Sequence, residues 1–502
     1  MNFFYNLKNR FEWIAQKSKL PEIKDATNEQ YKLSIIRIVI GILILVRNAE
    51  IVYAGTYLGV SDIGTLFGCI YLIVLVAFTI GLFTPLTSVF IFATYVLKFS
   101  NYYETHTLAD TTFLQLLTIM IFLNHGSKLS VDAWILSKNN IISKILRQIY
   151  AIIGFPKEKD FKIIYFYGFM AYALVSFGAF LYHVTDTHWI KGYTIQALLV
   201  NSYLCKYYNF FREIEAFSPE LMKWNSYFGL IGQSIFQIFM LPLVYFTWGK
   251  RFVNVWGWIF FLMSLFFIQL SYLPHTEILL WIVIFHTFKL DRIVDKNKKL
   301  EIRLPYKYRL YPAVFFYTII PFLYVMTNYR VINNITYKVS PYLTAKISWC
   351  CYAAGYALPI VFNKTDLALG NNWIVLEKKV KGKYQLVPFS GYDGNRLPYF
   401  TGFDYFLYSN HGSDVLYYGT ILQKRRKWGI IQTNPNIELK LDKNDKEYVQ
   451  LLAQFDYNYK KLSKPTTYRA TFYSTKSNDA TLSLEEKYKK KVLETFEITI
   501  EK

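Results

Sequence analysis

The chain has 502 residues, of which 53% are hydrophobic and 19% aromatic, and 56 Lys and Arg against 35 Asp and Glu give a net charge of +21. A soluble nucleic-acid-binding protein of this charge would carry far more than 18% charged residues, so we expect no nucleic-acid partner. The composition also excludes collagen-like, disordered and coiled-coil classes. It predicts a membrane protein, with basic loops beside apolar segments and aromatic side chains at the lipid–water boundary.

Residues 1–30 predict a basic amphipathic arm on the cytoplasmic side. Phe4, Leu7, Phe11 and Ile14 recur at helical spacing with basic residues between them. This pattern is typical of a helix that lies on a membrane surface, and equally of a helix that caps a bundle. The arm has no uninterrupted apolar core of the kind found in a cleavable signal peptide, so we expect insertion to use internal segments.

Residues 31–330 contain about nine apolar segments that are long enough to cross a bilayer, if short or tilted members are allowed. They are Leu33–Tyr53, Ile63–Phe83, Pro85–Phe99, Leu108–Leu123, Ile163–Val184, Trp224–Trp248, Phe252–Leu273, Ile278–Phe288 and Leu310–Asn328. Segment 347–362 is an alternative tenth span, although its small residues and Pro359 favour a buried or re-entrant helix. The sequence therefore predicts an α-helical polytopic membrane domain.

The charges in the loops predict the orientation of this domain. Cytoplasmic loops carry an excess of Lys and Arg, and the basic connections are the N-terminal arm, residues 124–162, the pair Lys250 and Arg251, and residues 289–309. A path through nine spans that starts in the cytoplasm leaves all of them inside. We therefore expect a multi-pass protein of the cell inner membrane, with its C-terminal segment on the outer side.

Residues 331–502 predict a smaller β-rich outer-face domain. The stretches NWIVLEKKV, KYQLVPF, YRATFYSTK and TFEITIEK alternate in the manner of strands and are separated by polar turns. Such a domain must be stabilised by its own core or by packing on the membrane domain. A sheet with an exposed edge would be able to bind an extended peptide by strand addition.

Four of the seven histidines fall at the outer ends of the predicted spans, each with a carboxylate within a few residues. The histidines are His106, His183, His188 and His275, and the carboxylates are Glu104, Asp110, Asp186 and Glu277. Imidazoles at one depth could line one outer-facing pocket and transfer protons at neutral pH. The alternative is that each is an ordinary interfacial histidine. The five-residue spacing of His183 and His188 does not support a metal site.

Charged residues also fall within the first predicted span. Arg37 lies in LSIIRIVIGILIL, and Arg47 and Glu50 lie near its outer end. A charge near hydrocarbon usually faces protein or water, and the alternative for Arg37 is that its side chain snorkels to the headgroups.

Three stretches, IIRIVIGILIL, LADTTFLQLLTIMIFLNHGSKLSVDAW and DTHWIKGYTIQALL, resemble the HTTM membrane domain, over roughly Lys32 to Asn328. This domain is shared by vitamin K-dependent gamma-carboxylase and its bacterial relatives. The resemblance implies a polytopic helical domain followed by an outer-side β-rich domain. In the carboxylase a lysine deprotonates a quinol, whose oxygenation yields the strong base that permits carboxylation of peptide glutamates.

The resemblance also implies roles for individual residues. The family lysine would fall on His183 or Val184, by spacing from Trp189, and no lysine stands there. His106 resembles the histidine that the carboxylase uses near its quinol, and Asp110 matches the aspartate of bacterial relatives. Histidine is a weaker base than lysine for a hydroquinone, so we do not expect true glutamate carboxylation.

The leading hypothesis is a gamma-carboxylase-like membrane protein that modifies or matures a peptide or a lipid-soluble, quinone-like substrate in an outer-facing pocket, by carboxylase-like or lyase-like chemistry. Its catalytic residues would be His183 and His106. Its substrate-binding residues would be Asp110, Asp186, Trp189 and His275. A quinol is the cofactor that the resemblance implies, and no metal is expected. The alternative is a non-catalytic membrane protein that assists export, maturation or immunity of a secreted peptide.

Overall fold

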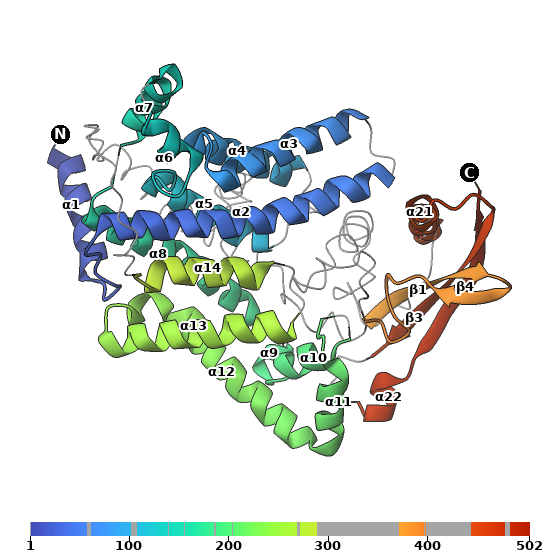
Figure 1. Ribbon diagram of the computed structural model, residues 1–502. Helices are drawn as coiled ribbons and strands as arrows, with labels where there is room; N and C mark the ends of the chain where they lie inside the picture. The colour runs from blue at the N-terminus through green and yellow to red at the C-terminus, as the bar shows by residue number, and fades with distance from the viewer. Residues whose placement is uncertain are drawn as a thin grey trace, which may run out of the picture.

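The computed structural model describes residues 2–57, 62–101, 108–138, 140–154, 156–184, 187–202, 204–268, 272–288, 371–395, 397, 443–476 and 482–501. The helices of the first part are α1 Asn2–Lys17, α2 Ala26–Tyr57, α3 Asp62–Ile80, α4 Thr84–Asn101, α5 Leu108–Leu123, α6 Val131–Leu136, α7 Ile141–Ile153, α8 Glu158–His183, α9 Thr187–Ile190, α10 Thr194–Val200, α11 Tyr208–Phe217, α12 Pro219–Leu243, α13 Thr247–Phe267 and α14 Leu273–Phe285. The C-terminal part contains β1 Asn371–Val380, β2 Lys383–Leu386, α21 Lys443–Tyr459, β3 Thr466–Thr475, α22 Leu484–Tyr488 and β4 Lys491–Ile500. The described part of the protein is therefore mostly helical, with one small sheet (Figure 1).

Each of the first eight predicted spans overlaps a helix, namely α2, α3, α4, α5, α8, α12, α13 or α14. Within the described residues, three helical stretches are long and apolar enough to cross a membrane by length and composition: Asp62–Ile80, Glu158–Leu181 and Pro219–Leu243. The predicted ninth span Leu310–Asn328 and the segment 347–362 lie outside the described residues. The membrane-like character of the helical part is thus supported by these three stretches.

Hydrogen bonds fix the direction in which α2, α5 and α14 run. Lys32, near the start of α2, donates to the carbonyl oxygens of Val283 and His286 at the C-terminal end of α14, at 2.9 Å each. Arg47, fifteen residues later, contacts Asp110 and Tyr272 at the N-terminal ends of α5 and α14. Both helices are therefore antiparallel to α2. We call the two ends of the bundle the Lys32 end and the Arg47 end.

The N-terminal helix α1 packs on the bundle at the Lys32 end. The hydroxyl of Tyr167 on α8 donates to the carbonyl oxygen of Phe11 at 2.9 Å, and Ala15 is fully buried. The chain that follows α1 is held as well, because the backbone N–H of Lys19 donates to the carbonyl oxygen of Val244 at 2.8 Å. Helix α1 therefore covers the side of α8 and the end of α12.

The four strands predicted from alternation are present, and the structure shows that they form one antiparallel sheet in the order β2-β1-β3-β4. Strands β1 and β2 are joined by Lys381 and Gly382, both with positive φ, which is the geometry of a tight two-residue hairpin. Helix α21 covers one face of the sheet and buries Leu452 and Phe455 against Phe472 of β3. The sheet thus has a hydrophobic core of its own.

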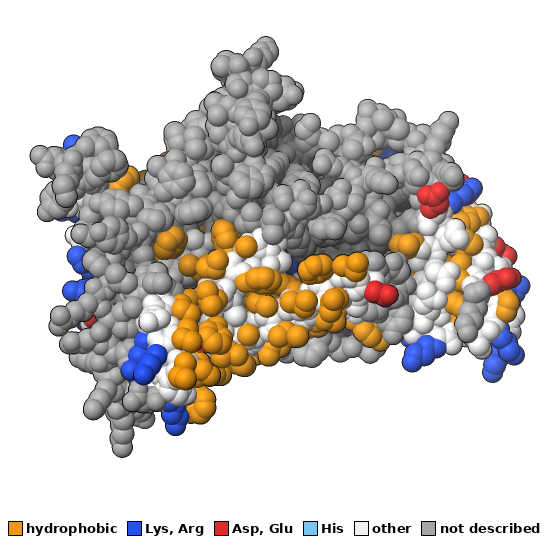
Figure 2. Space-filling model, turned by 90° about the horizontal axis from the view of Figure 1, so that it is seen from above, with side chains coloured by type: hydrophobic (Ala, Val, Ile, Leu, Met, Phe, Trp, Pro, Cys, Tyr) orange, Lys and Arg blue, Asp and Glu red, His pale blue; other side chains and the backbone are white. Residues whose placement is uncertain are grey.

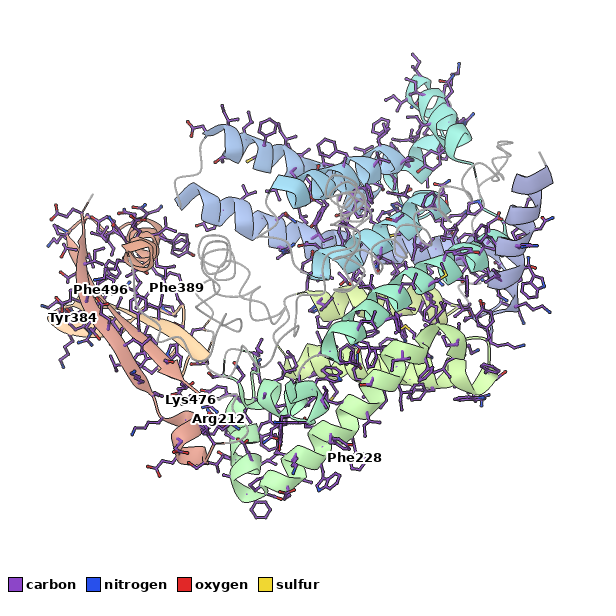
Figure 3. All side chains as sticks on the ribbon, turned by 180° about the vertical axis from the view of Figure 1, so that it is seen from behind. Arg212, Phe228, Tyr384, Phe389, Lys476 and Phe496 are labelled. Carbon is purple, nitrogen blue, oxygen red and sulfur yellow. The ribbon has the colours of Figure 1, made fainter. Side chains whose placement is uncertain are left out.

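The sheet lies beside the helical part, at the end opposite to α1 and α7 (Figure 1). Glu215 on α11 is buried and accepts hydrogen bonds from Lys487 Nζ and Tyr488 Oη, at 2.5 Å each. The guanidinium of Arg212 lies 4.2 Å from the centre of the Tyr488 ring, and Figure 3 shows Arg212 where the lower end of the sheet meets the helices. These contacts attach the C-terminal domain to α11.

Candidate functional site

The Arg47 end contains a buried polar cluster built from three helices. Arg47 Nη1 donates to Asp110 Oδ1 at 2.6 Å and to the hydroxyl oxygen of Tyr272 at 3.0 Å. The Tyr272 hydroxyl in turn donates to the same carboxylate oxygen, and the Arg47 guanidinium lies 4.5 Å from the centre of the tyrosine ring. Because the charges of Arg47 and Asp110 balance, the cluster joins α2, α5 and α14 without leaving an unpaired charge in the bundle.

The predicted base His183 is the last residue of α8 and lies at the same end. Helix α8 begins near the Lys32 end, because the Tyr165 hydroxyl donates to Glu29 at 2.7 Å, and His183 lies eighteen residues further along, or about 27 Å. The His183 ring is buried and stacks on the Trp189 ring with 4.0 Å between centres and 3° between planes. Trp189 Nε1 donates to Ser234 Oγ on α12 at 3.2 Å, so the plane of this stack is fixed.

The predicted substrate-binding residue His275 lies one turn after Tyr272 on α14. Its Nδ1 atom is buried and makes no hydrogen bond within the described part of the chain. An unsatisfied buried nitrogen costs about 1–3 kcal/mol, so it is a position where a bound molecule would gain a hydrogen bond. Two residues after it, buried Glu277 accepts a 2.7 Å hydrogen bond from the Tyr172 hydroxyl of α8.

The other predicted site residues are His106 and Asp186, and both lie outside the described residues. The remaining four are placed at the Arg47 end, by hydrogen bonds in the case of Asp110 and by helix direction in the cases of His183, Trp189 and His275. No group of three His, Cys, Asp or Glu side chains that could hold a metal ion occurs among the residues with described positions.

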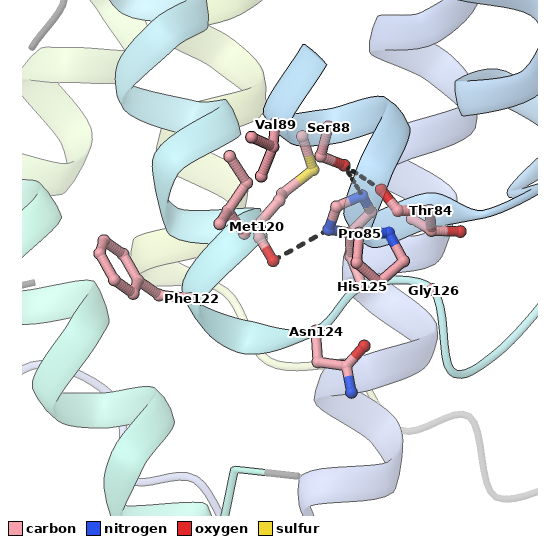
Figure 4. Close-up of a pocket in the computed structure, with 10 residues that line it drawn as sticks. Thr84, Pro85, Ser88, Val89, Met120, Phe122, Asn124, His125 and Gly126 are labelled. Carbon is pink, nitrogen blue, oxygen red and sulfur yellow. Dashed lines mark hydrogen bonds between the residues drawn. The ribbon is translucent and has the colours of Figure 1, made fainter. Parts of the chain in front are cut away.

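A cavity that the sequence analysis did not predict lies at the Lys32 end. Its volume is about 240 Å³, and its lining residues are Thr84, Pro85, Ser88, Val89, Met120, Ile121, Phe122, Asn124, His125 and Gly126. Figure 4 shows His125 between Ser88 and Met120: Nε2 lies 3.2 Å from Ser88 Oγ, and Nδ1 lies 2.9 Å from the Met120 carbonyl oxygen. Burial and the charge of Arg37 lower the pKa of His125 to about 3, so the ring is neutral.

The most specific stretch of the HTTM-like pattern supplies part of the wall of this cavity, including Met120 and His125, and its later residues fix the neighbouring loops. Asp132 accepts hydrogen bonds from the backbone N–H groups of Phe83 and Thr84, at 2.7 Å each, and from the Tyr150 hydroxyl at 2.8 Å. Ser130 caps α6 by accepting from the backbone N–H of Ala133 at 2.9 Å. These residues hold the α3–α4 and α5–α6 connections together, which is a structural role.

Arg37 does not snorkel. It is fully buried and donates to the carbonyl oxygens of His125 at 2.9 Å and Leu129 at 2.5 Å. The loop after α5 lies against α2 at this point, because Ser34 Oγ also donates to the His125 carbonyl oxygen at 2.9 Å. A buried guanidinium with two carbonyl partners fixes the loop that carries His125.

Comparisons with protein-family models, curated proteins and solved structures find no match to this chain. The HTTM resemblance therefore stays a prediction that depends on the three quoted stretches.

Proposed function

We propose that this chain is a multi-pass membrane protein that binds a lipid-soluble substrate with an ionisable hydroxyl group, such as a quinol, at the Arg47 end of its helical bundle. The observation that carries the proposal is the pair of imidazoles at this end. His275 has a buried Nδ1 that forms no hydrogen bond with the described residues, and His183 is held flat against Trp189.

Each imidazole has a definite task in this proposal. His275 binds the substrate oxygen through its unsatisfied nitrogen, and His183 accepts the proton, with its ring plane fixed by the Trp189 stack. His106 is a second hydrogen-bond partner for the substrate, and Asp186 supports His183. The Arg47–Asp110–Tyr272 cluster keeps the three helix ends in register around the substrate.

The proposed orientation follows the loop charges: nine spans, the N-terminus in the cytoplasm of the cell inner membrane and the sheet on the outer side. The Arg47 end, which lies nearer the sheet, then opens outward. Three stretches with the length and apolarity of membrane spans support the membrane-spanning character of the helical part, and the orientation depends on the loop charges alone.

A binding experiment with a short-chain benzoquinol and the full-length protein in nanodiscs tests the proposal. Replacing His275 with Phe removes the hydrogen-bonding nitrogen and should weaken binding about tenfold, the loss of roughly 1.4 kcal/mol. The matched control is His286→Phe at the Lys32 end, where the ring accepts from Trp258 Nε1 at 3.0 Å. Equal affinity of the His275→Phe variant and the unmodified protein would overturn the binding site.

The base is tested separately through quinol consumption in the presence of oxygen. His183→Ala should abolish turnover while the variant reaches the membrane at normal abundance. If this variant turns over at the normal rate, His183 is not the base.

A second candidate function, a non-catalytic protein that assists export, maturation or immunity of a secreted peptide, is favoured by one observation. Strand β4 forms one edge of the described sheet and is ten residues long. An edge of this length could pair with an extended peptide. Two results together would favour this candidate. Replacing Thr495 and Thr499 with Pro should abolish the export, maturation or immunity of the peptide, and His183→Ala should leave it intact.

A further inference from the structure

Helix α7 has a buried face and an exposed apolar face that do not coincide. Leu146 and Tyr150 are buried against Ile135 and Leu136 of α6. At about 100° per residue, the exposed isoleucines fall in a different sector of the helix. They are Ile141, Ile142 and Ile145, and Ile141 is 76% exposed. This second face is not accounted for by the packing of α7 on α6.

The third face of α7 is basic. Lys144 is exposed, and Arg147 is partly exposed and donates to the carbonyl oxygens of Leu136 and Lys138 at the end of α6. Helix α7 therefore has three faces. One is buried against α6, and the apolar face and the basic face are both at the surface. This is the pattern of a helix that lies in the plane of a membrane interface, with its isoleucines toward the acyl chains and its cations toward the headgroups.

Exposed tryptophans with basic neighbours surround the Lys32 end. Trp134 on α6 is 63% exposed with Lys138 Nζ 5.4 Å from its ring centre, and Trp13 on α1 is 59% exposed with Lys17 Nζ 5.7 Å away. Trp248 at the start of α13 is also exposed and is followed by Lys250 and Arg251. Figure 1 shows α1, α6 and α7 at the same end of the molecule. Tryptophan with lysine or arginine is typical of a bilayer interface.

The apolar surface of the helices continues from this end along the molecule. Figure 2 shows hydrophobic side chains in a band between Lys and Arg side chains on one side and the sheet region on the other. Helix α12 presents exposed apolar residues as well, and Figure 3 shows Phe228 on its outer surface. The basic and aromatic residues of the Lys32 end thus lie at the limit of a lipid-facing surface.

The position of α7 is fixed before any lipid binds. Asn140 and Ser143 form a reciprocal capping box at its N-terminus, and the Tyr150 hydroxyl donates to buried Asp132 at 2.8 Å. A helix that is already formed and attached does not have to fold on the membrane, so little conformational entropy opposes lipid binding.

We propose that α6 and α7 form an in-plane binding surface for anionic phospholipid headgroups, with Lys138 and Lys144 as the headgroup-binding residues and Ile141, Ile142 and Ile145 in the acyl region. Charge complementarity identifies the occupant: this surface presents cations. At the Arg47 end, by contrast, exposed Lys223 pairs with exposed Glu220 at 4.0 Å.

The test measures how many phosphatidylglycerol and phosphatidylcholine molecules the full-length protein retains from an equimolar mixture, by native mass spectrometry. Each basic residue near an anionic surface contributes about 1 kcal/mol, which is about fivefold. Lys138→Gln/Lys144→Gln should therefore lower the phosphatidylglycerol preference at least fivefold with the thermal stability unchanged. The matched control is Lys191→Gln/Lys223→Gln at the other end, which should retain the preference. An unchanged ratio in the first variant, or an equal loss in both, would overturn the proposal.

The apolar face is tested with a photo-crosslinking residue at position 145 in the reconstituted protein. Adducts with phospholipid acyl chains are expected. Crosslinks between two copies of the chain, or to another protein, in place of lipid adducts would show that a protein covers this face and would also overturn the proposal.

Discussion

Arg47 on α2 donates a 2.6 Å hydrogen bond to Asp110 on α5, and both side chains are buried in the helical bundle. Arg37, ten residues earlier on the same helix, is also buried, but its partners are two backbone carbonyl oxygens. The two arginines therefore stabilise opposite ends of the bundle in different ways, one through a charge pair and one through a loop. This difference leads to different expectations for their replacement.

Asp110→Ala should destabilise the helical part by about 3–5 kcal/mol, because it leaves the Arg47 guanidinium buried without its counter-charge. Thermal unfolding of the purified protein in detergent measures the loss. The double variant Arg47→Met/Asp110→Leu should recover most of it, since no unpaired charge remains. Glu220→Ala, which breaks only an exposed pair with Lys223, should cost less than about 1 kcal/mol and is the control. Normal melting of Asp110→Ala would show that the pair contributes nothing.

Arg37→Met should destabilise the Lys32 end, because the carbonyl oxygens of His125 and Leu129 lose their donor. Each unsatisfied buried acceptor costs about 1–3 kcal/mol. Arg37→Lys keeps the charge and one of the two hydrogen bonds, so it should fall between Arg37→Met and the unmodified protein. Hydrogen exchange of the loop after α5 provides the local measurement. Protection in Arg37→Met equal to that in the unmodified protein would contradict the assigned role.

The helices and strands could be predicted because their signals are local. Apolar segments of sufficient length predicted the positions of α3, α8 and α12, and alternation predicted all four strands of the sheet. The packing partners could not be predicted in the same way. Arg37 and the carbonyl oxygen of His125 are 88 residues apart, and Arg47 and Tyr272 are 225 residues apart. Only the folded chain brings such groups together.

In the candidate site, too, some features close together in the sequence could be predicted and partners from other helices could not. A carboxylate near each outer-end histidine was visible in the sequence, whereas the stacking of His183 on Trp189, six residues away, was not predicted. The partners of Asp110 come from α2 and α14, so spacing gave no sign of them. The cavity beside His125 was missed because its walls come from α4, from the end of α5 and from the loop after α5, which only the folded chain brings together.

The attachment of the sheet to the helical part should weaken at acidic pH through Asp393. Burial alone would raise the pKa of this carboxyl, but the hydrogen bond and charge of Lys490, with Tyr208 and Arg212, hold the pKa below its ordinary value. A lowered folded-state pKa contributes stability above the unfolded pKa of about 3.9, and this contribution is lost as the pH falls through the folded value.

Limited proteolysis of the C-terminal segment between pH 7 and pH 3 measures this dependence. The rate of cleavage should be constant near neutral pH and rise below about pH 4. Asp393→Asn removes the titrating group, so its cleavage should already be faster at pH 7 and should change less on acidification. An identical pH profile in the two proteins would exclude Asp393 as the titrating group.

Glu215→Ala should detach the C-terminal segment from α11 more strongly than any change at Asp393. Glu215 and Lys487 are both almost completely buried, and the carboxylate also accepts hydrogen bonds from Tyr488 Oη at 2.5 Å and Gln196 Nε2 at 2.7 Å. Its removal leaves a buried ammonium group and two donors without an acceptor, so we expect a loss of about 3–5 kcal/mol in the attachment.

Hydrogen exchange of α11 and α22 in the full-length protein measures this attachment directly. Both helices should lose protection in Glu215→Ala, while β1 and β3 keep theirs, because the sheet has its own core under α21. Lys487→Met leaves the carboxylate with its two uncharged donors and should lose less protection than Glu215→Ala. A loss of protection throughout the sheet would instead mean that the sheet does not fold without α11, and the two parts would then form a single cooperative unit.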